Sequence, residues 1–238
     1  NSNILINSSQ LRKGNLISKN FIEINDLIDL KDHRMMVSYA NKKLLIKGKG
    51  QVKLQNKFEL IDYEMTNHGS DLNLVSNLNI SELDVKNQNL IKGYLPKTND
   101  ILNIKDHKIK LDFKNSILSI KGQGKIKLDK EFNKIEYFLL KKNEKYNFKT
   151  DLEINDTPIK IDLINYEKDE KLNSKLKING NYNKKFGFDL KKISLLSKNS
   201  SLIINNLIID EKKKIEKLDK IDLEFFDRSD KKNKFTLS

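Results

Sequence analysis

Apolar and polar residues alternate along most of this chain, and the alternation is clearest in a stretch that occurs twice. Residues 46–54 read Ile-Lys-Gly-Lys-Gly-Gln-Val-Lys-Leu, and residues 120–128 read Ile-Lys-Gly-Gln-Gly-Lys-Ile-Lys-Leu. Successive side chains of a β-strand point to opposite faces of the sheet, so this period of two predicts a strand with one dry face and one wet face. The two glycines of each copy fall on the dry side.

The duplication extends well beyond this stretch at a constant offset of 74 residues (122 minus 48), and residues 28–87 align with residues 102–161 without an insertion. A duplication of this length indicates similar supersecondary units that stack side by side. A third, imperfect copy begins near Leu176, where Tyr182 stands in place of the second glycine. We therefore predict one continuous repetitive domain over residues 1–238, with units at about 28–101 and 102–175 and a partial unit at 176–238.

The alternating segments predict an all-β fold built as an antiparallel meander. Turns are expected at 129–133 and 155–158, two or three short strands at 1–27, continued strand positions at Ile159, Ile161 and Leu163, and a charged hairpin, favoured over a helix, at 211–220. No segment predicts an amphipathic helix long enough to cover the dry face. The meander could therefore be strongly twisted and curl into an open hydrophobic groove, or close as a β-sandwich or jelly roll. The inward glycines favour the groove, because a sandwich core needs side-chain volume at inner positions.

The dry positions predict the lining of such a groove. We expect it to comprise Ile46, Val52, Leu54, Ile61, Tyr63, Leu74, Ile109, Leu111, Phe113, Ile120, Ile126, Leu128, Ile135, Tyr137, Leu139, Phe148, Leu152 and Ile161. Glycine in a strand interior marks a bend, a bulge or the close approach of another group. Gly48, Gly50, Gly122 and Gly124 are accordingly predicted to let the sheet bend, and could also make room on the groove floor.

The amino-acid composition excludes several kinds of catalytic and metal-binding site. The chain has no Cys, which excludes disulfides, Cys-zinc sites and thiol catalysis. His33 and His107 each end a Lys-Asp-His triplet; the repeat accounts for the match and the lysines disfavour a cation, so we interpret them as a repeated turn and expect no metal site. No acid–base pair, serine with a base partner or phosphate-binding loop is readable. We predict a protein that is not an enzyme and takes no cofactor.

The net charge of +13 could indicate nucleic acid or an anionic membrane as a partner. The lysines, however, occupy alternate positions of nearly every strand, which is typical of a solvated sheet face, and AT-rich codon usage would also produce a Lys- and Asn-rich chain. Only three arginines occur, and no aromatic residues interleave with them as in nucleic-acid binders. We therefore expect no nucleic-acid partner. No run of about 20 apolar residues is present that could span a bilayer as a helix.

The succession of strand motifs resembles the central repeated region of AsmA-like proteins, and within that superfamily the large YhdP-type members. The resemblance covers roughly residues 28–195. It rests on the glycine strand, an Ile-x-Tyr strand (61–63 and 135–137), a Tyr-x-Phe strand, and an Ile-x-Ile-x-Leu strand that leads to Tyr166-x-Lys168. The shorter third unit departs from the pattern.

This resemblance implies a Gram-negative envelope protein, anchored in the inner membrane by an upstream helix and extending through the periplasm. It implies a β-sheet groove that holds phospholipid acyl chains and takes part in phospholipid transport to the outer membrane. Because the chain begins at Asn1 without an initiator Met, we expect it to be an internal fragment of a longer protein. The alternative from the residues alone is a structural or adhesive β-repeat protein with a closed core and no ligand.

Overall fold

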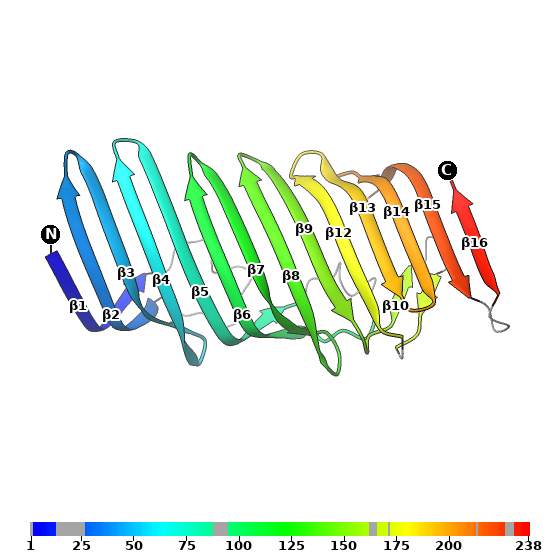
Figure 1. Cartoon of the computed structure of the whole chain (residues 1–238), viewed down its shortest axis with the longest axis horizontal. Coiled ribbons are helices and arrows are strands. Elements are labelled where there is room, and N and C mark those ends of the chain that lie inside the picture. Colours follow the sequence, from blue (N-terminus) through cyan, green and yellow to red (C-terminus); the bar gives the residue numbers. More distant parts are fainter. Residues whose placement is uncertain are drawn as a thin grey trace. The chain divides into compact units, whose positions relative to one another are not determined.

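A computed structural model describes residues 2–12, 27–87, 95–161, 166–170, 172–212, 214–226 and 231–238. Every regular element in these ranges is a β-strand, and fourteen strands form an antiparallel meander that is not closed into a barrel (Figure 1). Their order in the sheet, β1 to β9 and then β12 to β16, follows the chain. The predicted all-β antiparallel meander is therefore confirmed.

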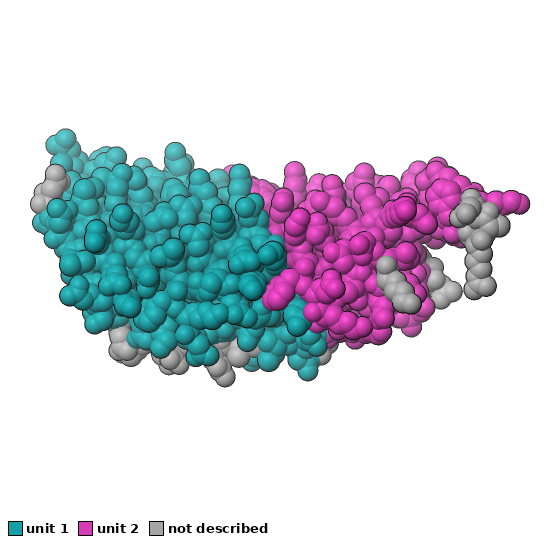
Figure 2. Space-filling model, turned by 60° about the horizontal axis from the view of Figure 1, so that its bottom comes forward, with its two compact units in different colours: residues 1–88, 99–127 teal, residues 89–98, 128–238 magenta. Residues whose placement is uncertain are grey.

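The chain divides into two compact units, residues 1–88 with 99–127 and residues 89–98 with 128–238 (Figure 2). Unit 1 contains β1 (Ser2–Arg12), β2 (Leu27–Ala40), β3 (Lys43–Leu54), β4 (Lys57–His68), β5 (Asp71–Lys86), β6 (Ile101–Lys114) and β7 (Ile117–Lys127). Unit 2 contains β8 (Phe132–Lys142), β9 (Lys145–Ile154), β10 (Ile159–Ile161), β11 (Tyr166–Lys168), β12 (Ser174–Asn183), β13 (Gly187–Ser197), β14 (Ser200–Ile209), β15 (Ile215–Phe226) and β16 (Lys232–Leu237). The division between units falls inside the second sequence repeat.

The duplicated sequence produces duplicated hairpins. The β2–β3 turn consists of Asn41 and Lys42, and the β6–β7 turn of Asn115 and Ser116, with φ between 50° and 61° at all four residues. Two consecutive residues with positive φ are typical of a type I′ turn, whose twist matches that of the flanking strands. Asparagine adopts this conformation more readily than most residues, so the sequence favours a tight hairpin at both places.

The strands of unit 1 depart from regular alternation at one level. The pairing of β2 with β3 shifts register between Lys31 and Arg34, and the pairing of β6 with β7 shifts between Lys105 and Lys108. Asp32 and Asp106 have positive φ at these points. An extra residue in one strand is a β-bulge, which bends that strand and re-aims its side chains. The bulges thus lie in the strands beside the glycine strands, which themselves keep regular pairing with their other neighbours where that is described.

The bulges bring His33 and His107 into the fold. Both side chains are buried, at 2% and 3% exposure, inside β2 and β6. The prediction that Lys-Asp-His forms a repeated turn is therefore wrong, although the repetition itself is reproduced. The positive-φ Asp before each His lies at the bulge, which changes the strand register. The period of two alone therefore does not predict to which face the His side chain points.

The glycines of the repeated stretch make room for these side chains. A Cβ built on Gly50 would lie 2.6 Å from Cγ and 2.8 Å from Cα of His33, and a Cβ built on Gly124 would meet the same atoms of His107 at the same distances. A Cβ on Gly48 would lie 2.5 Å from the Tyr63 hydroxyl oxygen. The space above three of the four glycines is thus filled by the chain's own rings.

The two repeats diverge after β9. Strand β5 runs on to Lys86, whereas β9 ends at Ile154 and β10 pairs with β11 in a separate two-stranded sheet. Pro158 stands where the first repeat has Asp84, whose backbone N–H donates to Gln55 Oε1. Proline has no N–H to donate and is excluded from central strands. The alternation predicted that Ile159 and Ile161 continue the meander, and this prediction is wrong. Leu163 lies outside the described residues.

Other local predictions have mixed outcomes. The turn at 155–158 is confirmed in position, and the one predicted at 129–133 lies at 128–131, because Phe132 and Asn133 already belong to β8. Residues 211–220 include the predicted hairpin, with β15 beginning at Ile215. Of the strands predicted within 1–27, the described residues 2–12 form one, β1; residues 13–26 lie outside the described part of the chain, so the further short strands stay a prediction.

We expect Gly50→Ala to lower the free energy of unfolding by about 1–3 kcal/mol, because overpacking of a filled site costs this much. Urea denaturation of Gly50→Ala, His33→Ala and the double variant measures the coupling. Since His33 Cα also crowds this site, the double variant should recover only part of the loss. Equal losses from Gly50→Ala and the neighbouring Lys49→Ala would contradict the packing argument.

Candidate functional site: the apolar face of the sheet

The register of the strands assembles the dry positions of unit 1 into one face. Met35, Gly48 and Tyr63 lie opposite one another on β2, β3 and β4. The neighbouring row is Val37, Ile46, Met65, Leu74, Phe113 and Leu118, across β2 to β7. Residues that pair directly across strands point to the same side, so the face is continuous from β2 to β7.

Most of the predicted lining residues are only partly covered. Val52, Leu128 and Leu152 are buried. The other fifteen are partly exposed: Ile46, Leu54, Ile61, Tyr63, Leu74, Ile109, Leu111, Phe113, Ile120, Ile126, Ile135, Tyr137, Leu139, Phe148 and Ile161. Within unit 1 the dry face is thus apolar but not sealed. Of the four glycines, Gly48 and Gly122 are buried, and Gly50 and Gly124 are partly exposed.

His33 and Tyr63 form a polar pair on this face. Their ring centroids are 6.0 Å apart, with the rings above Gly50 and Gly48 respectively. Burial raises the pKa of Tyr63 above its ordinary value. His33 Nδ1 has no hydrogen-bond partner among the described residues. The glycines therefore leave room for amphipathic rings. A count of apolar positions alone does not reveal this role.

His107 occupies the equivalent place in the second repeat, above Gly124. Its pKa is lowered from the ordinary 6.5, chiefly because burial disfavours the charged imidazolium, and a hydrogen bond with the backbone of Lys105 opposes the shift. The neutral ring is thus the form that this fold favours.

The fold should lose stability as pH falls through 6.5. The unfolded chain takes up the His107 proton at a higher pH than the folded chain, so the free energy of unfolding decreases below 6.5 and levels off below the folded pKa. Urea denaturation between about pH 7.5 and about pH 5 should show a shallower pH slope for His107→Gln than for the wild type. His68→Gln changes the exposed residue that ends β4 and is the control; identical slopes in all three proteins would refute the assignment.

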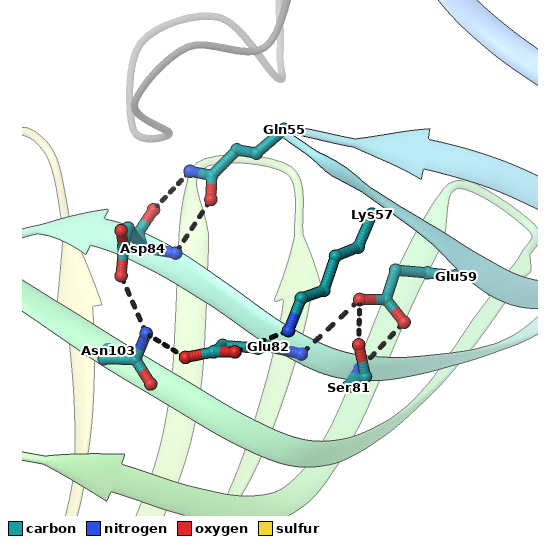
Figure 3. Close-up of polar contacts among 7 residues, drawn as sticks. All are labelled: Gln55, Lys57, Glu59, Ser81, Glu82, Asp84 and Asn103. Carbon is teal, nitrogen blue, oxygen red and sulfur yellow. Dashed lines mark hydrogen bonds and ion pairs between the residues drawn. The ribbon is translucent and has the colours of Figure 1, made fainter.

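A buried carboxylate stabilises the irregular part of β5. Ile80 and Leu83 are both buried although they are three residues apart, so β5 departs from alternation around Ser81. Glu59, 3% exposed, accepts hydrogen bonds from Ser81 N at 2.8 Å and from Ser81 Oγ at 2.7 Å (Figure 3). Backbone N–H groups of a folded chain need a hydrogen-bond partner, and Glu59 supplies the partner of this partly buried one.

We call the contact of Glu59 with Ser81 the clamp. Further polar contacts lie beyond it, towards the ends of the strands. Lys57 Nζ lies 2.5 Å from Glu82 Oε2, and Asn103 Nδ2 donates to Glu82 Oε1 at 3.1 Å and to Asp84 Oδ1 at 2.8 Å (Figure 3). The hydrogen bonds from Lys57 and then Asn103 hold the pKa of Glu82 below its ordinary value. Every carboxylate in this network has a donor, so the network is structural rather than poised for acid–base chemistry.

The second repeat keeps the clamp with different chemistry. Asn133, at the position equivalent to Glu59, is fully buried, and its Oδ1 accepts a hydrogen bond from Asn155 N at 3.0 Å. Asp156 Oδ2 accepts from Lys130 N at 2.8 Å and Glu131 N at 2.6 Å. What the two repeats share is a buried side-chain oxygen that binds the backbone where the long strand becomes irregular. The alternating pattern hid this role, because Glu59 and Asn133 fall on the dry face.

We expect Glu59→Leu to lower the free energy of unfolding by about 1–3 kcal/mol, because it removes the charged acceptor of the Ser81 N–H and Oγ–H hydrogen bonds. Glu59→Gln keeps an acceptor oxygen and should cost less. Glu64→Leu is the control: Glu64 lies on the polar face and forms an ion pair with Lys47 at 2.9 Å, which is worth at most about 1 kcal/mol. Chemical denaturation measures all three; a loss from Glu59→Leu no larger than that from Glu64→Leu would count against the clamp.

Unit 2 covers part of its own dry face. Residues buried there include Leu152, Ile154, Leu195, Leu202, Ile204 and Ile221 from the main strands. Ile159 of β10 and Lys168 of β11 are also buried, and the Tyr166 side chain is hydrogen-bonded to Ser200 at the start of β14. Leu95, from the segment between β5 and β6, is buried too, and the adjacent Lys97 lies 2.6 Å from Glu170. The β10–β11 hairpin and residues 95–98 thus pack onto this unit.

Lys168 is the one buried ammonium that the described residues show in this packing. Its Nζ donates to Thr157 O at 2.9 Å and Asp169 O at 3.2 Å. Desolvation lowers its pKa, against the attraction of Asp156 and then Asp169. Backbone carbonyls therefore hold the ammonium, which ties β11 to the turn after β9.

Other features bear on the kind of site. A shallow depression of about 610 Å³ lies over β1 to β4 and is lined by Arg34, Lys49 and Asp62 among others. It includes none of the predicted lining residues, and of the predicted sheet-bend glycines only Gly48. Within the described ranges, no cluster of three or more metal-ligating side chains occurs, and no helix is long and apolar enough to cross a membrane.

Comparisons with known proteins add no neighbour: no protein-family profile, no curated protein and no solved structure matches this chain.

Proposed function

We propose that the apolar face of unit 1 binds the acyl chains of phospholipid. The observation that carries this proposal is a continuous apolar face, on a sheet not closed into a barrel, whose side chains stay partly exposed. Apolar surface left in water forfeits about 25 cal/mol per Å² relative to burial. An acyl chain that runs along the rows of Ile, Leu and Phe would recover this free energy without any specific polar contact.

The polar groups on this face are compatible with such a ligand. The Glu59 carboxylate is buried and accepts hydrogen bonds from the backbone and side chain of Ser81, so it is not presented to a ligand on this face. The side chains of His33 and Tyr63 fill the space that a Cβ on Gly50 or Gly48 would need. No bond is made or broken in this function: the residues exclude water and offer dispersion contacts.

In the cell, the chain would serve as a lipid-conducting segment of a bacterial envelope protein, with acyl chains on the apolar face and headgroups at its margin. The likeness of its strand motifs to AsmA-like proteins supports a periplasmic location, an inner-membrane anchor upstream, and transfer of phospholipid between the inner and outer membranes.

A structural β-repeat role is the second candidate, and unit 2 favours it. There the β10–β11 hairpin and residues 95–98 bury leucines and isoleucines that would otherwise face a ligand. A chain that sealed both units in this way would be a scaffold without a lipid.

The absence of tryptophan from the sequence allows a direct test. Leu111 lies on the apolar face between Ser76 and Ile120, and Lys110 beside it lies on the polar face. We expect the fluorescence of Leu111→Trp to be quenched by phospholipid brominated on its acyl chains, and that of Lys110→Trp to stay unchanged, because bromine quenches only at contact distance.

Mass spectrometry of lipids that co-purify with the wild-type chain provides an independent measurement. Stoichiometric phospholipid, reduced in Leu111→Asp but not in Lys110→Gln, supports the proposal; both substitutions change the charge by the same amount. Thermal melting shows whether each variant folds. Equal quenching at both tryptophans, or a folded protein free of lipid, would favour the scaffold.

A further inference from the structure

Two neighbouring hairpins of unit 2 end side by side. In β8–β9, Lys142 pairs with Lys145, and in β12–β13, Asn183 pairs with Gly187. Strand β9 also pairs with β12, with Lys145 opposite Asn183, so the two turns lie at the same end of the sheet. We call Lys141, Lys142, Lys145, Lys184, Lys185 and Phe186 the basic tip.

The basic tip concentrates cations that no carboxylate neutralises. Its five lysines face one acidic residue in these turns, Glu144, and within the described structure none of the five forms an ion pair. Elsewhere in unit 2 lysines do find carboxylates, as in Lys175–Asp151 at 3.1 Å and Lys191–Asp189 at 2.9 Å. The basic tip differs from these paired positions because five lysines that form no ion pair among the described residues gather in two neighbouring hairpins.

Aromatic side chains accompany these cations. Phe186 is 65% exposed at the tip, and Lys185 Nζ lies 5.5 Å from its ring centroid. Behind it, Tyr182 lies 4.7 Å from Phe188 and 5.9 Å from Tyr146 between ring centroids. Lys141 Nζ lies 5.8 Å from the Tyr146 ring. Amphipathic aromatic rings and lysines are the residues that favour the boundary between water and lipid.

The opposite end of unit 2 has different chemistry. Glu170 lies 2.6 Å from Lys97, and Asp156 accepts two backbone N–H groups. Carboxylates there are engaged within the protein. In the sequence of the β14–β15 turn, at the same end as the basic tip, Asp210 and Glu211 stand beside three lysines, so its net charge is only +1. Free positive charge thus peaks at the two neighbouring hairpins.

We infer that the basic tip is a peripheral docking surface for an anionic lipid bilayer. The five lysines contact lipid phosphates, and Phe186 inserts between headgroups, as in proteins that combine basic residues with an aromatic anchor. Nucleic acid is the poorer fit, because the tip contains no Arg, the residue that reads phosphate and base edges bidentately. This docking does not depend on lipid binding by the apolar face of unit 1.

Sedimentation of the whole chain with vesicles tests the inference. Vesicles of phosphatidylcholine with about 30% phosphatidylglycerol should bind the chain, pure phosphatidylcholine should not, and about 0.5 M salt should release it. Lys184→Gln/Lys185→Gln should weaken binding about thirtyfold (about 2 kcal/mol for two lysines at an anionic surface). Lys108→Gln/Lys110→Gln removes the same charge from the polar face of β6, where both lysines are exposed, and should weaken binding far less. Phe186→Ser should weaken it at constant charge.

Three results would overturn the inference. They are no binding to anionic vesicles, equal losses from the two lysine pairs, and tighter binding to a single-stranded RNA oligonucleotide that depends on Lys184 and Lys185. Because these residues are exposed, unchanged thermal melting should confirm that each variant folds. Failure here would leave the acyl-chain quenching at position 111 unaffected, so the two proposals are separable.

Discussion

The close approach of an imidazole to a glycine backbone is the contact on which the geometry of unit 1 depends. Where His33 lies above Gly50 and His107 above Gly124, no side chain could occupy the glycine position without displacing the ring. The same level of the sheet carries the bulges of β2 and β6. Bulge, histidine and glycine therefore form one structural motif: the bulge directs the ring inward, and the glycine leaves space for it.

Buried polar side chains hydrogen-bond the backbone where β5 becomes irregular and where β9 ends. Glu59 takes the N–H of Ser81, and Asn133 takes that of Asn155. The acid and the amide differ in charge, yet both supply an oxygen to a backbone N–H that would otherwise lose its hydrogen bond. This explains why the polar residues Glu59 and Asn133 stand on an otherwise apolar face.

The same alternation of apolar and polar residues gives differently covered faces in the two units. In unit 1 the apolar face stays partly exposed, whereas in unit 2 a short hairpin and residues 95–98 pack onto it. One residue contributes to this divergence: Pro158 cannot provide the backbone donor that Asp84 provides in the first repeat. The acyl-chain proposal therefore rests on unit 1, and the docking proposal rests on the hairpin ends of unit 2.

The sequence by itself determined the strand class, the antiparallel meander and the 74-residue repetition, because a period of two and a gapless duplication are local patterns. It also placed the Gly-x-Gly positions on the dry side. Only the tertiary structure decided that His33 and His107 are buried in bulges instead of exposed in turns, that Glu59 holds β5, and that β10 leaves the sheet. Each of these depends on a contact between residues far apart in the chain, and strand periodicity carries no information about such partners.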